Sequence, residues 1–236
     1  MMILALESSA TACSAALSRD GELVAQSWQN SGLTHSRTLL PMVDSMLKNC
    51  EMTLEQVDVV AVAAGPGSFT GLRIGVATAK GLAWAEDKDC AACSTLESMA
   101  WPLAHMEGCL IVCAMDARRK QVYNAIFEAE GDTIRRIAPD RAISLADLGE
   151  ELKNYNKPKI IVGDGAQLCY NTLSAEIPDM KLAPRPLRMQ SAVGVARAAE
   201  ELAKNGQLVK GGALTPIYHR LSQAERERLE REQTKH

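Results

Sequence analysis

The sequence predicts an α/β protein made of two successive units that share one plan: three strands, a helix, a strand and a helix. The first evidence is an unbroken, β-branched apolar run at residues 59–64, typical of a strand buried on both faces, with a glycine-rich turn and an apolar helix directly after it. The same order of elements returns from residue 110 onward. With 236 residues, of which 47% are apolar, the chain is long enough to bury one large core or two modest ones.

The first unit opens with a predicted three-stranded meander, in which a turn containing Asp20 and Gly21 joins the second and third strands. A helix with a wide apolar stripe follows, and the last helix of the unit begins at a capping box formed by Ser94 and Glu97. In chain order we expect strands at residues 3–6, 12–17 and 23–28, a helix at 36–50, the central strand at 59–64, the central helix at 71–84 and a short helix at 94–103.

The second unit repeats this order at the level of elements and not of residue identity. A further helix is expected at residues 191–204, and residues 224–236 form a mixed-charge tail, either a solvated helix or a disordered end. The predicted elements are strands at residues 110–115, 122–127 and 133–137, a helix at 145–155, a strand at 159–162, and a turn at 163–166 that opens another helix. We therefore expect an N-terminal domain at residues 1–105, a C-terminal domain at 106–220 and a charged tail at 221–236.

The glycine-rich turn at residues 65–71 allows two interpretations. The free amides at the start of the following helix, which Ser68 or Thr70 can cap, would suit a phosphate. Alternatively, the glycines let the strand turn tightly into a closely packed helix. The spacing matches neither a P-loop, since no lysine follows, nor the dinucleotide-binding fingerprint. Within the helix, small residues recur every four positions, which lets another backbone approach closely.

Composition and charge bound the function. No apolar run reaches the roughly 18 residues that span a membrane, and the N-terminus lacks the basic start of a secretory signal, so a cytoplasmic protein without membrane contact is expected. Seven cysteines without framework spacing fit a reducing compartment. Cys90 and Cys93 have redox or zinc spacing, but no second pair follows and the segment is predicted as a short strand. A net charge of −3 argues against a chain that binds the nucleic-acid backbone without a partner.

Residues 65–75, GPGSFTGLRIG, resemble the signature of the bacterial TsaB (YeaZ) family, and residues 215–220 resemble its closing segment. This family is the non-catalytic partner of TsaD, the tRNA threonylcarbamoyl transferase. The resemblance implies the actin, Hsp70 and sugar-kinase (ASKHA) fold. It also implies an accessory subunit that, with TsaD and the ATPase TsaE, supports transfer of threonylcarbamoyl from its adenylate to the tRNA adenosine beside the anticodon.

In nucleotide-binding proteins of this fold, the first hairpin carries an acidic residue near the phosphates. The corresponding candidates are Glu7 and Ser8, with Gly65 and Gly67 in the glycine-rich turn. The alternative is that Glu7 is only a residue at a strand end; relatives often have Asp there. We expect no cofactor of the chain's own, and ATP or ADP at most at the interface with TsaD. Arg118 and Arg119 either reach a nucleotide or RNA at such a surface or are exposed turn charges.

The catalytic relative TsaD binds metal through two histidines four residues apart on a helix. At the corresponding place this chain has residues 95–99, in which Glu97 remains and both histidines are missing. His105 and Glu107 imitate that motif, but Gly108 should break a helix there. The resemblance therefore implies a chain that is not an enzyme. The alternatives are an ASKHA kinase or ATPase that acts alone, and a metallopeptidase.

The helices at residues 36–50 and 71–84 are more apolar than one packing partner requires. Either they are fully buried within the monomer or they bind another subunit, and the resemblance favours TsaD, with a homodimer when the chain is alone and tRNA bound only through the complex. A charge at Gly75 or Ala79 is expected to break the pair. The residues expected to contact the partner are His35, Leu39, Val43, Met46, Arg73, Gly75, Val76 and Ala79.

Overall fold

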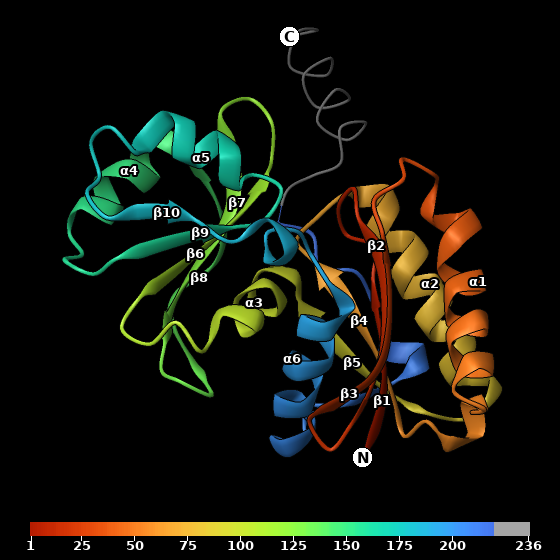
Figure 1. Cartoon of the computed structure of the whole chain (residues 1–236). Coiled ribbons are helices and arrows are strands. Elements are labelled where there is room, and N and C mark those ends of the chain that lie inside the picture. The colour runs from red at the N-terminus through yellow and green to blue at the C-terminus, as the bar shows by residue number, and fades with distance from the viewer. Residues whose placement is uncertain (220–236) are drawn as a thin grey trace, which may run out of the picture.

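The structure, a computed structural model, describes residues 1–219 and shows two sheets, each covered by helices (Figure 1). The charged tail predicted at residues 221–236 lies outside the described residues. No helix of the described part is both long and apolar enough to cross a membrane.

The first sheet has the strand order β11-β5-β4-β1-β2-β3, in which β1 pairs antiparallel with β2 and parallel with β4. The meander and the central strand are thus confirmed. The strands are β1 (Met2–Glu7), β2 (Cys13–Arg19), β3 (Glu22–Gln29), β4 (Val59–Gly65), β5 (Asp89–Ser94) and β11 (Val209–Lys210).

Helices α1 (His35–Asn49) and α2 (Phe69–Ala85) cover one face of this sheet, and α6 (Ala192–Lys204) covers the other (Figure 1). The apolar stripes of α1 and α2 pack on large residues of β1 and β4. The opposite face is lined by alanines, so that α6 lies close to the strands. Although α6 and β11 follow the second unit in sequence, they belong to the first, so the domain predicted at residues 106–220 includes a segment that returns to the N-terminal sheet.

The second sheet has the order β10-β9-β6-β7-β8, the counterpart of β5-β4-β1-β2-β3 in the first. The internal repeat is therefore present in strand topology as well as in element order. The strands are β6 (Leu110–Asp116), β7 (Gln121–Ala129), β8 (Ile134–Ser144), β9 (Lys159–Val162) and β10 (Met180–Leu182).

Helices α4 (Leu145–Lys153) and α5 (Ala166–Leu173) pack on one face of the second sheet, and α3 (Thr95–Ala100) packs on the other, between the two units (Figure 1). Two predictions need correction. The strand predicted at 133–137 continues to Ser144, and the three-residue β10 was not predicted. Among the described residues there are also short 3-10 turns: η1 (Leu54–Gln56), η2 (Trp101–Leu103), η3 (Arg185–Leu187) and η4 (Gly211–Ala213).

Candidate functional site: the glycine-rich turn and the outer helix face

The glycine-rich turn joins β4 to α2 and is closed by contacts from its own chain. Ser68 is the N-cap of α2, since its Oγ accepts a hydrogen bond from the Gly71 amide at 3.3 Å. The Ser68 amide donates to the Ser9 carbonyl at 2.6 Å. One of the amides that an anion would use is therefore already bound to the loop between β1 and β2.

The glycines of this turn are required by backbone packing. Gly65 has φ of +145°, and a Cβ there would lie 2.1 Å from the Ile217 carbonyl oxygen. A Cβ on Gly71 would lie 2.1 Å from the Ser8 carbonyl oxygen, and one on Gly67 2.6 Å from that of Ser9. The first hairpin and the C-terminal segment thus contact the turn from two sides. These contacts account for the glycines as close-packing residues, the second of the two interpretations.

Glu7 and Ser8 lie at the end of β1, beside this turn, and both are buried. The Ser8 hydroxyl donates to the Gly71 carbonyl at 2.9 Å, so it holds the hairpin against α2. Glu7 Oε1 accepts a hydrogen bond from the Ser9 amide at 2.5 Å, while Oε2 is buried with no hydrogen-bond partner among the described residues. Burial raises the pKa of Glu7 to about 7, hydrogen bonding from Ser9 lowers it in part, and the charge of Asp164 raises it further.

The second unit has an equivalent turn between β9 and α5. Gly163 has φ of +109°, and a Cβ there would lie 2.1 Å from the Ala114 carbonyl oxygen; one on Gly165 would lie 2.9 Å from the Asp116 amide. The Gln190 amide group donates to Asp164 Oδ1 at 3.0 Å, and burial raises the pKa of Asp164. Each unit therefore packs a glycine turn on its own first hairpin, and acidic groups of both units lie near one another at the boundary.

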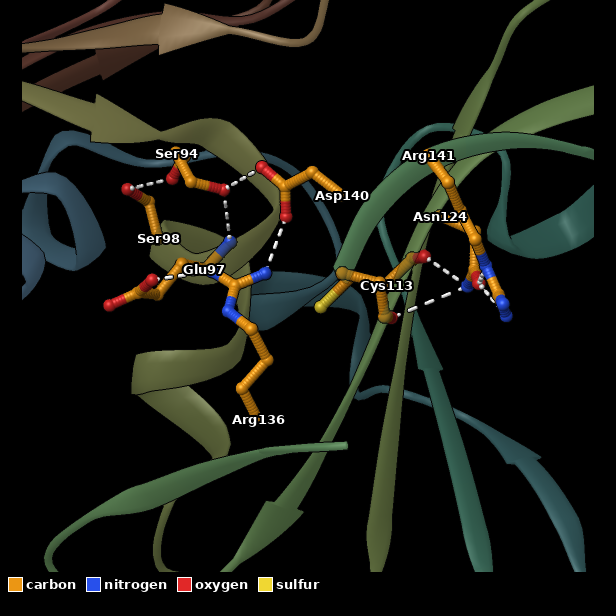
Figure 2. Close-up of polar contacts among 9 residues, drawn as sticks. Ser94, Glu97, Ser98, Cys113, Asn124, Arg136, Asp140 and Arg141 are labelled. Carbon is orange, nitrogen blue, oxygen red and sulfur yellow. Dashed lines mark hydrogen bonds and ion pairs between the residues drawn. The ribbon is translucent and has the colours of Figure 1, made fainter. Parts of the chain in front are cut away.

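Glu97, a residue of α3, takes part in a polar network between the units (Figure 2). Its carboxylate pairs with Arg136 at 2.5 Å, and Arg136 also binds Asp140 at 2.6 Å. Ser94 caps α3 by accepting from the Glu97 amide at 3.1 Å and donates to Asp140 at 2.5 Å. Glu97 thus joins α3 to β8. Sequence reasoning missed Arg136 and Asp140, because their strand was predicted to end before Asp140.

The structure decides two motifs that resemble metal or redox sites in the sequence, one around His105 and one at Cys90 and Cys93. His105 lies in a turn after η2, and Gly108 has φ of +78°, so no helix carries a histidine pair there. Cys90 and Cys93 lie in β5 but belong to cores on opposite faces of the sheet, which rules out their pairing. Within residues 1–219, no group of three or more His, Cys, Asp or Glu side chains is arranged to hold a metal ion.

Most residues predicted to contact a partner lie in the core of the first unit. Three of the predicted residues lie elsewhere. Gly75 faces the first hairpin, since a Cβ there would lie 2.5 Å from Ser8 Oγ. His35 is half-buried, with Nε2 at 2.7 Å from the Ala10 carbonyl oxygen, and Arg73 is exposed. Apolar periodicity marks the face of a helix that is buried, and here that face contacts the sheet. The core residues, none more than 5% exposed, are Leu39, Val43, Met46, Val76 and Ala79.

The side of these helices that points away from the sheet carries other residues. On α2 they are Arg73, Ala77, Gly81 and Trp84, and on α1 Leu40; together we call them the outer helix face. Trp84 is 88% exposed and Leu40 52% exposed. A Cβ on Gly81 would meet no atom within 4 Å. In the sequence, small residues recur every four positions on the buried side of α2, and the large Trp84 does not belong to this repeat. That difference is the signal that could have identified the outer helix face.

The family model of TsaD, tRNA N6-adenosine threonylcarbamoyltransferase, matches residues 29–225. The chain is 37% identical to the tRNA threonylcarbamoyladenosine biosynthesis protein TsaB of Bacillus subtilis over 168 residues, 71% of this chain and 73% of that protein. It is 33% identical to TsaB of Escherichia coli over 162 residues, 68% of this chain and 64% of that protein.

Among solved structures, YeaZ from Pseudomonas aeruginosa superposes with a TM-score of 0.74 at 25% identity, covering 92% of this chain and 99% of that chain. A second structure from this organism, a protein with similarity to peptidase YeaZ, has a TM-score of 0.77 at 24% identity, covering 93% and 99%. These likenesses and the repeated strand order confirm the expected ASKHA fold. The chain belongs to the TsaB (YeaZ) family of tRNA threonylcarbamoyladenosine biosynthesis proteins.

Proposed function

We propose that this chain is the non-catalytic subunit that binds and activates TsaD for formation of threonylcarbamoyladenosine in tRNA, and that it does so through the outer helix face. The observation that carries the proposal is Trp84, a large aromatic side chain 88% exposed beside the small residues Ala77 and Gly81. Aromatic anchors dominate the energy of protein interfaces, and small residues let a second helix come close. This face therefore fits a helix of another protein.

The assignment of chemistry to TsaD rests on the surroundings of α3. The positions that resemble the two metal-binding histidines of TsaD are Thr95 and Met99, both buried in this chain. Glu97 between them is engaged by Arg136. A residue held in an ion pair between two units has a structural role, which supports an accessory subunit.

The proposed mechanism is differential binding. A subunit without a reacting group of its own can raise the activity of its partner only by binding the active conformation of that partner more tightly than the inactive one. The outer helix face would hold TsaD in the competent conformation. TsaE would join this pair, and tRNA would be bound through the complex.

The glycine-rich turn fits a phosphate poorly, because the Ser68 amide is bound to Ser9 and Gly65 packs on Ile217. We therefore assign no nucleotide to the chain alone and derive no step through one. In this proposal ATP or ADP belongs to a site shared with TsaD.

The test is threonylcarbamoyl transfer to unmodified tRNA by TsaD and TsaE, with and without this chain and with the chain alone. We expect transfer only in the complete mixture, and loss of that transfer with Trp84→Ala. ATP turnover by the isolated chain would favour the ASKHA kinase or ATPase alternative. Stoichiometric metal after purification without chelator, together with peptide cleavage, would favour a metallopeptidase. Full transfer without this chain would overturn the proposal.

A further inference from the structure

Residues 214–218 cross the glycine-rich turn and bring Tyr218 beside Arg73 of the outer helix face. Leu214 is buried in the core under α1 and α2, and the Ile217 amide donates to the Ala64 carbonyl at 2.7 Å. Ile217 and Tyr218 are nevertheless 44% and 41% exposed. We call residues 214–218 the C-terminal strap.

The strap fixes the orientation of Arg73. The rings of Tyr218 and Phe69 are stacked with their centroids 4.4 Å apart and an interplanar angle of 20°. The Arg73 guanidinium carbon lies 4.0 Å from the Phe69 ring centroid, and Arg73 Nε donates to the Tyr218 hydroxyl at 3.1 Å. Two aromatic side chains, one of them from the strap, therefore hold a single arginine.

Among the described residues, the terminal nitrogens of this arginine have no hydrogen-bond or ion-pair partner. No carboxylate within residues 1–219 forms an ion pair with Arg73, and its hydrogen bond to Tyr218 uses only Nε. A planar guanidinium whose orientation is already set loses less entropy when it binds a carboxylate with two parallel hydrogen bonds. The cluster is thus prepared for an acidic group that this part of the chain does not supply.

The position of the cluster indicates what supplies that group. Arg73, Ala77, Gly81 and Trp84 follow one another at spacings of four, four and three residues, so they form a single stripe along α2. Arg73 is the N-terminal end of this stripe. Because the rest of the stripe is small or apolar and the chain carries a net charge of −3, the face suits a protein helix better than a phosphate backbone.

We propose that the C-terminal strap, Phe69 and Arg73 form the carboxylate-binding end of the outer helix face, and that the group bound there is an Asp or Glu side chain on a helix of the protein partner. This inference rests on the proposed function and adds the strap to the interface. Tyr218 is a positioning residue that acts through Arg73.

The test is the dissociation constant for TsaD, measured by calorimetry at low and high salt. Arg73→Gln should weaken binding about tenfold, which corresponds to about 1.4 kcal/mol, because it removes one charge-assisted pair. It should also flatten the salt dependence, because one ion pair is gone. Tyr218→Phe keeps the stack and removes the acceptor of Nε, so a loss of about threefold is expected. Arg185→Gln, at an exposed arginine of the second unit, is the matched control and should change nothing.

The outcomes separate this inference from the proposed function. If the wild-type chain does not bind TsaD, the proposed function fails. If Trp84→Ala weakens binding but Arg73→Gln and Tyr218→Phe match the wild type at both salt concentrations, only the carboxylate-binding end is overturned. If Arg73→Gln instead abolishes binding of tRNA by the isolated chain and leaves TsaD binding unchanged, the cluster binds phosphate and the inference is wrong. Circular dichroism confirms that each variant is folded.

Discussion

The two sides of α2 carry small residues at the same spacing but have different surroundings. On the inner side, Gly71 and Gly75 face Ser8, where added Cβ atoms would lie 2.1 and 2.5 Å from its atoms. On the outer side, a Cβ on Gly81 would meet nothing within 4 Å. The spacing alone therefore does not show where close approach occurs; the Cβ distances place it on the inner side, where the first hairpin makes the contact. On the outer side no atom of the described residues makes such a contact at Gly81, which is the side that we propose for the partner.

The largest effects should come from placing a charge on α2: on the inner side it should lower stability, and on the outer side it should prevent TsaD binding. In Gly75→Asp the new side chain is forced onto Ser8 and a carboxylate is buried without a partner, which costs roughly 4 kcal/mol or more. We expect little folded protein. Gly81→Asp points into solvent and should leave the free energy of unfolding within about 0.5 kcal/mol while abolishing TsaD binding.

Urea unfolding and copurification with TsaD measure the two effects. A folded Gly75→Asp variant that has lost only TsaD binding would show that the inner side is the interface. The earlier expectation that a charge at Gly75 or Ala79 reports on the pair thus needs revision, because both residues are buried and such variants report on folding.

The next effect concerns Glu7, on the buried hairpin that contacts the inner side of α2. Burial raises its pKa from 4.5 to about 7, so the folded state holds the proton more tightly than the unfolded state. Stability is then fully present below pH 4.5 and falls as the pH rises to about 7, by on the order of 3 kcal/mol.

The free energy of unfolding, measured with urea, should be lower at pH 8 than at pH 5 in the wild type. In Glu7→Gln most of this difference should disappear, because glutamine does not titrate. Trp84→Ala, on the outer side, should keep the wild-type dependence on pH. If Glu7→Gln and the wild type lose the same stability between these two pH values, Glu7 is not the responsible group.

Trp84→Ala tests the outer side without a new charge. Because Trp84 is 88% exposed in the chain alone, its removal should change the midpoint of thermal unfolding by very little. Binding to TsaD should weaken by about 2 kcal/mol or more, as for a large aromatic anchor that a partner buries. Calorimetry measures this loss, and an unchanged affinity would remove Trp84 from the interface.

This comparison also shows how far the sequence reaches. Apolar runs and glycine turns predicted the central strand of each unit and the helix that follows it. The second half of β8, after residue 137, was missed because an edge strand tolerates charged residues such as Asp140 and Arg141, and three-residue β10 carries too little pattern. At the site, periodicity identified the buried stripe of α1 and α2. It could not show that Ser8 fills the space beside the first turn of α2, or that Ile217 packs on Gly65 at the end of β4.

The smallest effect is also the most direct comparison, because one substitution is made on both sides of the same helix. Gly81→Ala should raise the free energy of unfolding by about 0.8–1 kcal/mol, since alanine has the higher helix propensity and its Cβ meets open space. Gly75→Ala gains the same propensity but places its Cβ 2.5 Å from Ser8 Oγ and 3.2 Å from Val62, so it should lower stability. Urea unfolding of the two variants should therefore shift in opposite directions. Two shifts of the same sign would mean that Ser8 moves aside at little cost, and that the inner contact is looser than its geometry indicates.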